Sequence, residues 1–325
     1  MSRWFISGSF AILSCLARPA AAQSAGFHGP ISGFVYIHGS QTIQPLLGIP
    51  GAARMGVPII RDADFASVGP NNDWALIVRA GQSSLIRGLA DLTPVTSSVS
   101  GLIDAVDRVV WNRDGSFALL YSSSGNLLQR IQLSAAGASP DPPMDLSPWG
   151  TIAALTIDPA GQRIAFGVAG SGLYVFTAGQ SPALLSSMAQ PAVAAFDGTG
   201  QRLYAVDLAQ QQIFEFDSGS NALAFAPLAP PNTPAVTPIG LAVSGDGRYL
   251  LLADGAAQAV RVYDTVSAGV ATTIQLDFPP SRFEALSPAP TFLLNGDNRN
   301  EWLMLLDARQ LPGLSFVPAK REEVQ

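Results

Sequence analysis

The chain has 325 residues, of which 48% are hydrophobic and 13% are charged, and its formal net charge is −6. This composition supplies a large core and excludes a mainly disordered chain, which would have few apolar residues and many charges. The acidic excess disfavours nucleic acid and anionic membrane surfaces as partners, because both repel negative charge.

Residues 1–22 have the pattern of a secretory signal peptide. Arg3 gives a positive start, Trp4–Leu16 is apolar but too short to span a bilayer, and Ala20–Ala22 supplies small residues for cleavage. We therefore expect a secreted or periplasmic mature chain that begins near Gln23. Its net charge becomes about −8, because two arginines leave with the signal.

The only cysteine, Cys15, lies within this segment. Ile12–Cys15 offers a second interpretation as a lipoprotein cleavage site with Cys15 acylated, but Leu before Ser fits that pattern less well than the alanines fit signal cleavage. If Cys15 leaves with the signal, the mature chain has no cysteine and disulfides are excluded, although an exported compartment would permit them. No apolar stretch beyond the signal is long enough to span a bilayer.

A short turn motif recurs along the rest of the sequence. Asp, Asn or Ser is followed three residues later by Gly and then by apolar residues, most clearly in Asn112–Leu120, Asp158–Phe166, Asp197–Asp207 and Ser244–Leu252. The polar side chain can hydrogen-bond to the downstream backbone, and glycine accepts the positive φ angle that such turns often need. Each copy therefore predicts a β-hairpin whose second strand is buried.

The third residue after the turn glycine marks the phase of this repeat. With weaker copies included, successive markers lie 39 to 47 residues apart, at Val35, Ala75, Ala118, Ile164, Leu203, Leu250 and Leu293. A period of about 40 to 50 residues with only strand signals between turns indicates propeller blades of about four strands. The sequence thus predicts an all-β fold, a seven-bladed β-propeller of four-stranded antiparallel blades in one domain over residues 23–325. A membrane β-barrel is disfavoured, because its strands have about ten residues and the predicted ones have about four to six.

The predicted blades follow one another along the chain. They cover Ser32–Ile60, Asp64–Arg87, Arg108–Leu133, Ala153–Phe176 and beyond, Ala192–Phe216, Ile239–Tyr263 and Phe283–Val317. The last blade already has four strands. An open ring would leave two unprotected sheet edges, so we expect one terminus to pair with the blade of the other, through Ala25–Pro30 or Leu314–Val317.

Two proline-rich stretches interrupt the repeat, at Ala138–Pro148 and at Leu228–Pro234 with Pro238 beyond. Their prolines should prevent ladder pairing and favour extended chain on the surface. Loops on a rigid scaffold often carry binding, so these two are the preferred site region, with simple spacing between strands as the alternative.

Two of the copies resemble the repeats of a known group of propellers. Phe196–Asp207 with Ile213–Phe216, and Leu241–Asp254 with Val260–Tyr263, are similar to the repeats of the YVTN and lactonase-like seven-bladed propellers. The resemblance covers nearly all of the mature chain and implies the seven-bladed fold. Members that hydrolyse lactones or phosphoesters use a metal ion or a His/Glu/Arg set at the central channel, so it also implies hydrolysis as one possible activity.

Candidate catalytic groups are few. The only histidines are His28, in a terminal segment, and His38, which closes a strand just before Gly39. A histidine base needs an orienting carboxylate and a nucleophile or water, and nothing around His38 supplies that set, so we expect a partly exposed histidine at a blade edge. No spacing of residues matches a zinc site.

Acidic and aromatic residues also have structural explanations. Turn formation is enough to explain the positions of four aspartates, Asp114, Asp158, Asp197 and Asp246. Asn295–Asn300 is the densest group of oxygen ligands, but it lacks a terminal glutamate at the EF-hand spacing, so turn residues are favoured over a Ca²⁺ site. Aromatic residues that recur in phase are expected to pack between blades; they are Phe34, Trp74, Phe117, Tyr249 and Phe292.

These observations predict an exported propeller that serves as a binding or interaction scaffold without catalysis. We expect a monomer with no cofactor, no metal site and no catalytic residue, and its partner is an unidentified protein or small molecule. The alternative is a lactonase-like or other hydrolase that uses the central channel and a divalent cation. Converging carboxylates at the end of the channel would favour the hydrolase.

Overall fold

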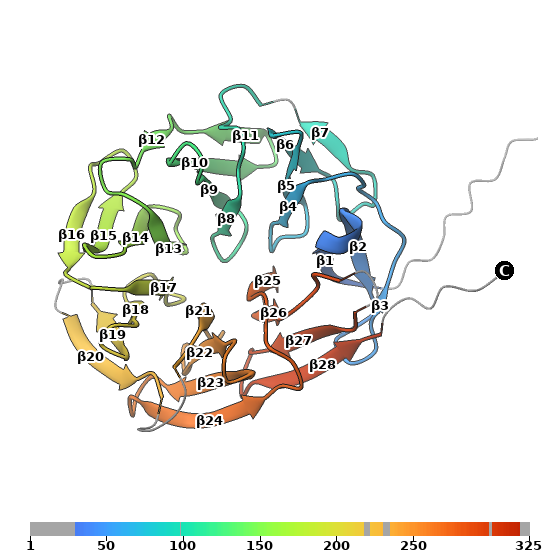
Figure 1. Ribbon diagram of the computed structural model, residues 1–325. Helices are drawn as coiled ribbons and strands as arrows, with labels where there is room; N and C mark the ends of the chain where they lie inside the picture. The colour runs from blue at the N-terminus through green and yellow to red at the C-terminus, as the bar shows by residue number, and fades with distance from the viewer. Residues whose placement is uncertain (1–29, 98, 218–221, 230–234, 299–300, 319–325) are drawn as a thin grey trace, which may run out of the picture.

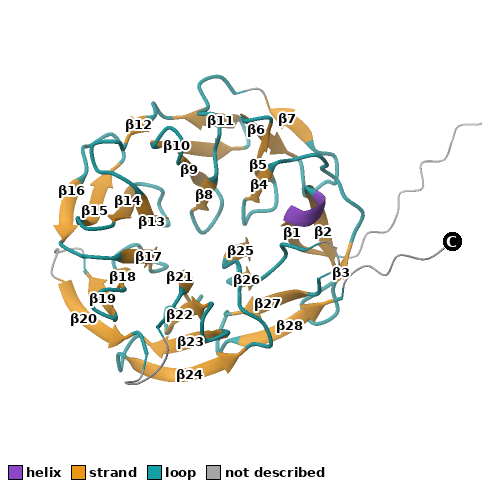
Figure 2. Ribbon diagram, viewed as in Figure 1, coloured by secondary structure: helices purple, strands orange, loops and turns teal. Residues whose placement is uncertain are grey.

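The computed structural model describes residues 30–97, 99–217, 222–229, 235–298 and 301–318. Seven antiparallel sheets surround a central axis as blades (Figure 1). Apart from the short 3-10 turn η1 (His38–Ser40), the regular structure of the described residues is entirely β (Figure 2). No helix in these ranges is long and apolar enough to cross a membrane. The predicted seven-bladed β-propeller is confirmed, whereas the predicted signal, residues 1–22, lies outside the described residues.

Each blade is a meander whose strands follow in chain order from the axis outward, and β12 is a short addition to the third blade. The first three blades comprise β1 (Ile31–Ile37), β2 (Thr42–Leu47) and β3 (Arg54–Met55); β4 (Phe65–Val68), β5 (Trp74–Arg79), β6 (Gln82–Arg87) and β7 (Val95–Ser97); and β8 (Arg108–Trp111), β9 (Phe117–Ser122), β10 (Leu127–Ser134), β11 (Gly137–Pro140) and β12 (Met144–Asp145).

The remaining four blades have four strands each. They comprise β13 (Ile152–Ile157), β14 (Arg163–Val168), β15 (Gly172–Thr177) and β16 (Ala183–Ser186); β17 (Pro191–Phe196), β18 (Leu203–Asp207), β19 (Gln212–Phe216) and β20 (Ala222–Pro227); β21 (Pro238–Val243), β22 (Tyr249–Asp254), β23 (Ala259–Asp264) and β24 (Gly269–Gln275); and β25 (Glu284–Ser287), β26 (Thr291–Leu293), β27 (Leu303–Asp307) and β28 (Gly313–Val317).

In six blades the recurring turn joins the first and second strands, as predicted, whereas in the first blade the marker Val35 lies in the inner strand β1, so the weak copy predicted there lies one strand too early. The turn glycines adopt the same left-handed conformation, with φ of 71° at Gly115, 69° at Gly161, 72° at Gly200 and 74° at Gly247. The strand that follows is buried along nearly its whole length, for example in β18 and β22. Burial on both faces follows from the architecture, because each sheet is packed between two neighbouring blades.

The turn glycines also make room for contacts between blades. A Cβ atom on Gly161 would overlap the ring of Phe117 in the preceding blade. The carbonyl of Gly161 accepts a hydrogen bond of 2.7 Å from Arg130 Nη1, and the carbonyl of Gly200 accepts one of 2.7 Å from Arg163 Nη1. The repeated glycine is therefore required by a close approach between blades as well as by the turn.

Apolar clusters fill the spaces between neighbouring blades. Tyr204 of the fifth blade packs with Leu250 and Tyr263 of the sixth, and all three are almost fully buried. The aromatic residues that recur in phase belong to such clusters. Packing between blades, which the sequence predicted for them, is confirmed.

One of the two predicted ways of closing the ring, through Leu314–Val317, is wrong. Among the described residues, β28 with Leu314–Val317 pairs only within the C-terminal blade, and β1 pairs only with β2. The first and last blades meet through packing of residues such as Val35 and Leu305. A hydrogen bond of 2.8 Å from Arg282 Nη1 to the carbonyl of Tyr36 also joins them. Side-chain packing thus joins the two blades. Of the other candidate, Ala25–Pro30, only Pro30 is described, so closure through that segment stays a prediction.

The first proline-rich stretch does not prevent pairing, contrary to the prediction. Pro140 faces Ile131 in the register of β11 with β10, and Met144 faces Leu128 through β12. These short strands form the outer edge of their blade, where a missing N–H group leaves no ladder bond unmade. In the second stretch, residues 230–234 lie outside the described residues, and Pro238 begins the inner strand β21.

Candidate functional site

The inner strands of six blades enclose a central channel of about 650 Å³. Its wall contains residues of β4, β8, β13, β17, β21 and β25, and none of the described residues of the first blade. The inner strands β8, β17 and β21 are only partly buried, unlike the second strands behind them, because one face of each looks onto the open axis, whereas β13 is mostly buried. A rigid, preformed concavity of this size is typical of a small-molecule site.

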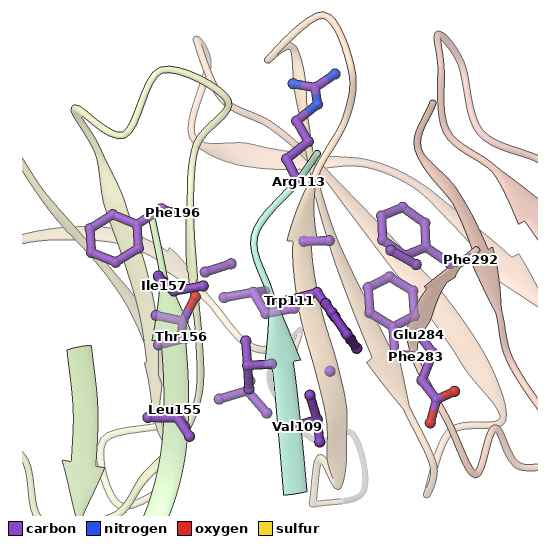
Figure 3. A pocket seen from close by; sticks show the side chains of 18 of the residues that line it. Val109, Trp111, Arg113, Leu155, Thr156, Ile157, Phe196, Phe283, Glu284 and Phe292 are labelled. Carbon is purple, nitrogen blue, oxygen red and sulfur yellow. The ribbon is translucent and has the colours of Figure 1, made fainter. Parts of the chain in front are cut away.

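Most of the side chains that line the channel are small or aliphatic, although about half of the channel's exposed surface is polar. Figure 3 shows Val109 of β8 and Leu155 and Ile157 of β13 along it. Alanines at positions 153, 192, 194, 242 and 285 keep the centre open. Phe283 and Phe292 add a stacked aromatic pair with ring centroids 4.6 Å apart. The wall therefore offers apolar side chains for contact beside a polar surface of similar extent.

One polar pair fixes an aromatic side chain of the wall. Trp111 Nε1 donates a hydrogen bond of 2.9 Å to Ser67 Oγ in the neighbouring blade. This bond satisfies the indole N–H, so the ring is held in place with its apolar surface available.

Arg113 lies at one end of the channel, beyond the apolar side chains (Figure 3). It belongs to the turn between β8 and β9, and its side chain crosses toward the corresponding turns of two other blades. Its Nη2 atom is 3.5 Å from the carbonyl oxygen of Gly245, and its Nη1 atom lies 2.5 Å from the point that a Cβ on Gly198 would occupy. The sequence prediction did not single out Arg113. A comparison of the turns position by position would have found it, since the turns of the other five blades that line the channel carry Gly or Pro there: Pro70, Pro159, Gly198, Gly245 and Pro288.

The four turn aspartates have the structural role that the sequence predicted. Each accepts a backbone N–H bond from its own turn: Asp114 from Ser116, Asp158 from Gln162, Asp197 from Arg202 and Asp246 from Arg248. Burial alone would raise the pKa of Asp114, but the hydrogen bonds from Ser116 outweigh it and hold that pKa below its usual value. The hydroxyl of Ser244 lowers the pKa of Asp246 in the same way. Both groups are therefore stable carboxylates and not proton donors at neutral pH.

An ionic cluster joins the channel wall to the first blade. Arg282 Nε lies 3.0 Å from Asp297 Oδ1, and Nη1 lies 3.8 Å from Glu284 Oε2. Its guanidinium is 5.9 Å from the centre of the Tyr36 ring. Enclosure by the wall raises the pKa of Glu284, and Arg282 opposes that rise. Because 52% of the Glu284 side chain still reaches solvent, we assign it as an ionised residue paired with Arg282.

The histidine and calcium candidates lie away from this site. His38 is exposed in η1 and meets Tyr36 edge-on, with ring centroids 5.7 Å apart, and it does not line the channel. His28 lies outside the described residues. The side chain of Asn295 is buried and hydrogen-bonds with the backbone of Trp302 and Met304, so its role is structural. Within the described ranges, no three His, Cys, Asp or Glu side chains are grouped as a metal site.

A second cavity, of about 400 Å³, lies between the third and fourth blades. Asp141, Pro142 and Met144 of the first proline-rich stretch form one side, and Ile164 and Phe176 form the other. Arg130 crosses its edge, with Nε 2.7 Å from Asp141 Oδ2. This loop, one of the two preferred site regions from the sequence, thus borders a cavity at the outer side of the ring and not the channel.

Comparison with known proteins supports the fold. No protein-family model and no curated protein matches the sequence. Among solved structures, a protein from Lactobacillus plantarum has a TM-score of 0.63 and 16% identity, covering 88% of this chain and 95% of that one. Virginiamycin B lyase from Staphylococcus aureus has a TM-score of 0.55 and 16% identity, with 79% and 84% covered. A 6-phosphogluconolactonase-like protein from Bacteroides fragilis has a TM-score of 0.56 and 12% identity, with 88% and 96% covered.

At these identities the similarity shows a shared fold and nothing finer. Propellers support many unrelated functions on one scaffold, and activity resides in the groups around the channel and on the loops. The comparisons therefore establish that this chain is a seven-bladed β-propeller, and they do not distinguish a binding protein from an enzyme.

Proposed function

We propose that the protein is an exported propeller that binds a small, largely apolar molecule in its central channel without altering it covalently. The signal-like residues 1–22 support export, and the turn repeats support kinship with the YVTN and lactonase-like propellers. Both remain proposals that processing and comparison of close homologues can test.

The apolar side chains of the channel wall carry this proposal. Burial of apolar surface is worth about 25 cal/mol per Å², so a ligand that buried roughly 200 Å² of it would gain about 5 kcal/mol before the costs of association. The inner strands are held by the blades behind them, so little ordering is needed on binding. A preformed apolar wall favours retention of a ligand more directly than it favours bond cleavage, which requires a base, a nucleophile or a metal ion in reach of the substrate.

The alternative is a hydrolase of the lactonase-like kind. It would place a divalent cation or a general base among the groups that line the channel. The carboxylates of the described lining are Glu284, Asp107 and Asp197. Arg282 pairs with Glu284, the hydroxyl of Ser123 donates to Asp107, and the hydroxyl of Thr199 donates to Asp197. These contacts favour the binding role, since a general base needs a carboxylate that is free to accept a proton from the substrate or from water.

Fluorescence titration with phenylnaphthylamine, a neutral apolar probe, tests the proposed function on mature protein expressed as residues 23–325. We expect saturable binding that is lost in Ala285→Trp, because Ala285 is exposed to the channel and a bulky ring would fill it. Ala136→Trp is the matched control, since this alanine is exposed in the turn between β10 and β11. Equal binding by all three proteins, or no binding by the unaltered protein, would contradict a channel site.

Thermal unfolding with EDTA and then with excess Ca²⁺, Mg²⁺ or Zn²⁺ tests the alternative. A cation present at a hundred times its dissociation constant would stabilise the folded protein by about 2.7 kcal/mol. A shift with one cation, together with hydrolysis of a lactone, would support the hydrolase.

A further inference from the structure

The end of the channel near Arg113 carries an unusual charge arrangement. The side chain is exposed, and its one polar contact among the described residues is the bond of 3.5 Å to the carbonyl of Gly245. A guanidinium has five N–H donors, so most of its hydrogen-bonding capacity is unused. No described carboxylate lies within ion-pair distance of it. Arg108 and Arg163 likewise lack a carboxylate partner among the described residues, but each of them donates to backbone carbonyls at 3.1 Å or less, which Arg113 does not.

The surrounding turns leave space for this side chain. Gly198 and Gly245 occupy the two turns toward which Arg113 reaches, and a Cβ at either would lie within 3.5 Å of the guanidinium. Prolines occupy the corresponding position in the other three turns, and proline brings no charge or N–H donor to the channel. The end of the channel is thus shaped around a single cation.

The carboxylates on the same face are engaged elsewhere. Asp114 bonds to Ser116, Asp246 to Ser244 and Arg248, and Asp197 to Thr199 and the backbone of Arg202. Their charges lower the electrostatic potential around Arg113, so free anions in solution are only weakly attracted. A ligand anion must therefore be held by direct contact while the rest of the ligand is bound by the wall.

We propose that Arg113 receives the anionic end of the ligand, a carboxylate or another group with two acceptor oxygens, while the apolar part lies against Val109, Trp111 and Leu155. A planar guanidinium matches two oxygens with two parallel hydrogen bonds. This inference rests on the proposed function and adds the chemical class and orientation of the ligand, an amphipathic anion that enters from the Arg113 end.

Two matched probes separate this inference from the proposed function. Anilinonaphthalene sulfonate has the same aromatic body as phenylnaphthylamine and an added sulfonate. We expect Arg113→Met to weaken binding of the sulfonate probe about tenfold, as loss of a solvent-exposed charge-assisted hydrogen bond predicts. The affinity for the neutral probe should change by less than about twofold. Arg113→Lys should lose less affinity for the sulfonate probe, because lysine keeps the positive charge.

The control is Arg309→Met, which removes an exposed arginine of the last blade that pairs with Asp307 and does not line the channel. This variant should leave the affinity for both probes unchanged. If Arg113→Met leaves the sulfonate probe unchanged while the neutral probe still binds, the assignment of Arg113 is wrong and the channel site stands. If Arg113→Met lowers the melting temperature and weakens both probes equally, Arg113 braces the turns and does not recognise the ligand. If neither probe binds the unaltered protein, the proposed function itself fails.

Discussion

Replacement of the turn glycine Gly161 by alanine should destabilise the propeller more than the same replacement at Gly247. Both residues have similar positive φ angles, 69° and 74°, so each alanine carries a backbone strain of about 1 to 2 kcal/mol. The two sites differ in their surroundings. A Cβ on Gly247 meets nothing within 4 Å, whereas a Cβ on Gly161 would overlap the Phe117 ring and lie 2.8 Å from even its Cε2 atom.

The Phe117 ring cannot move away freely, because the guanidinium of Arg130 lies 5.1 Å from its centre and also bonds to the carbonyl of Gly161. Overpacking of this kind costs about 1 to 3 kcal/mol. We therefore expect a loss of about 1 to 2 kcal/mol for Gly247→Ala and about 2 to 5 kcal/mol for Gly161→Ala. For a chain of this size, each kcal/mol lowers the melting temperature by about 2 °C.

Urea unfolding of the mature protein, followed by circular dichroism, gives both free energies. The double variant Gly161→Ala with Phe117→Leu should recover part of the loss, since the smaller side chain frees the space that the Cβ needs, and a double-mutant cycle measures that coupling. Equal losses at the two glycines, or a cycle with no coupling, would refute a close approach between blades as the reason for the glycine.

Two further predictions concern buried polar groups of the sixth blade. Arg261→Met should lower the free energy of unfolding in urea by about 3 kcal/mol, because the fully buried carboxylate of Asp254 loses its cation 3.0 Å away. Arg309→Met on the surface should lower it by less than about 1 kcal/mol. Similar losses for the two variants would contradict this reasoning. Burial raises the pKa of the Tyr263 hydroxyl to about 12, above a value near 10 in the unfolded chain. The difference corresponds to about 3 kcal/mol of folding stability, which is fully present below pH 10 and is lost as the pH rises toward 12. Tyr263→Phe should flatten the alkaline loss of stability measured between pH 9 and 12, and an unchanged slope would assign that loss to other groups.

Much of the fold could be predicted because the repeated turn is a local signal. Asp197, Gly200 and the strand after them lie within about ten residues, and the hydrogen bonds that Asp197 accepts from its own turn are decided by those residues alone. The phase of the markers then set the number of blades. Proline was the exception at Pro140, because its effect on pairing depends on whether the strand lies at the edge of a sheet, and the local sequence does not decide that.

The candidate site depended on tertiary structure. Arg113, Gly198 and Gly245 belong to three different blades, and only the way the sheets stack around the axis brings the guanidinium over the channel and opposite those glycines. Contact between the first and last blades also depends on tertiary structure, since Arg282 donates a hydrogen bond to the carbonyl of Tyr36, 246 positions away in the sequence. The sequence by itself determined turns, strands and their repeat, because these arise from neighbours along the chain. The angle at which sheets pack, and therefore which side chains meet at the axis, is a property of the whole ring.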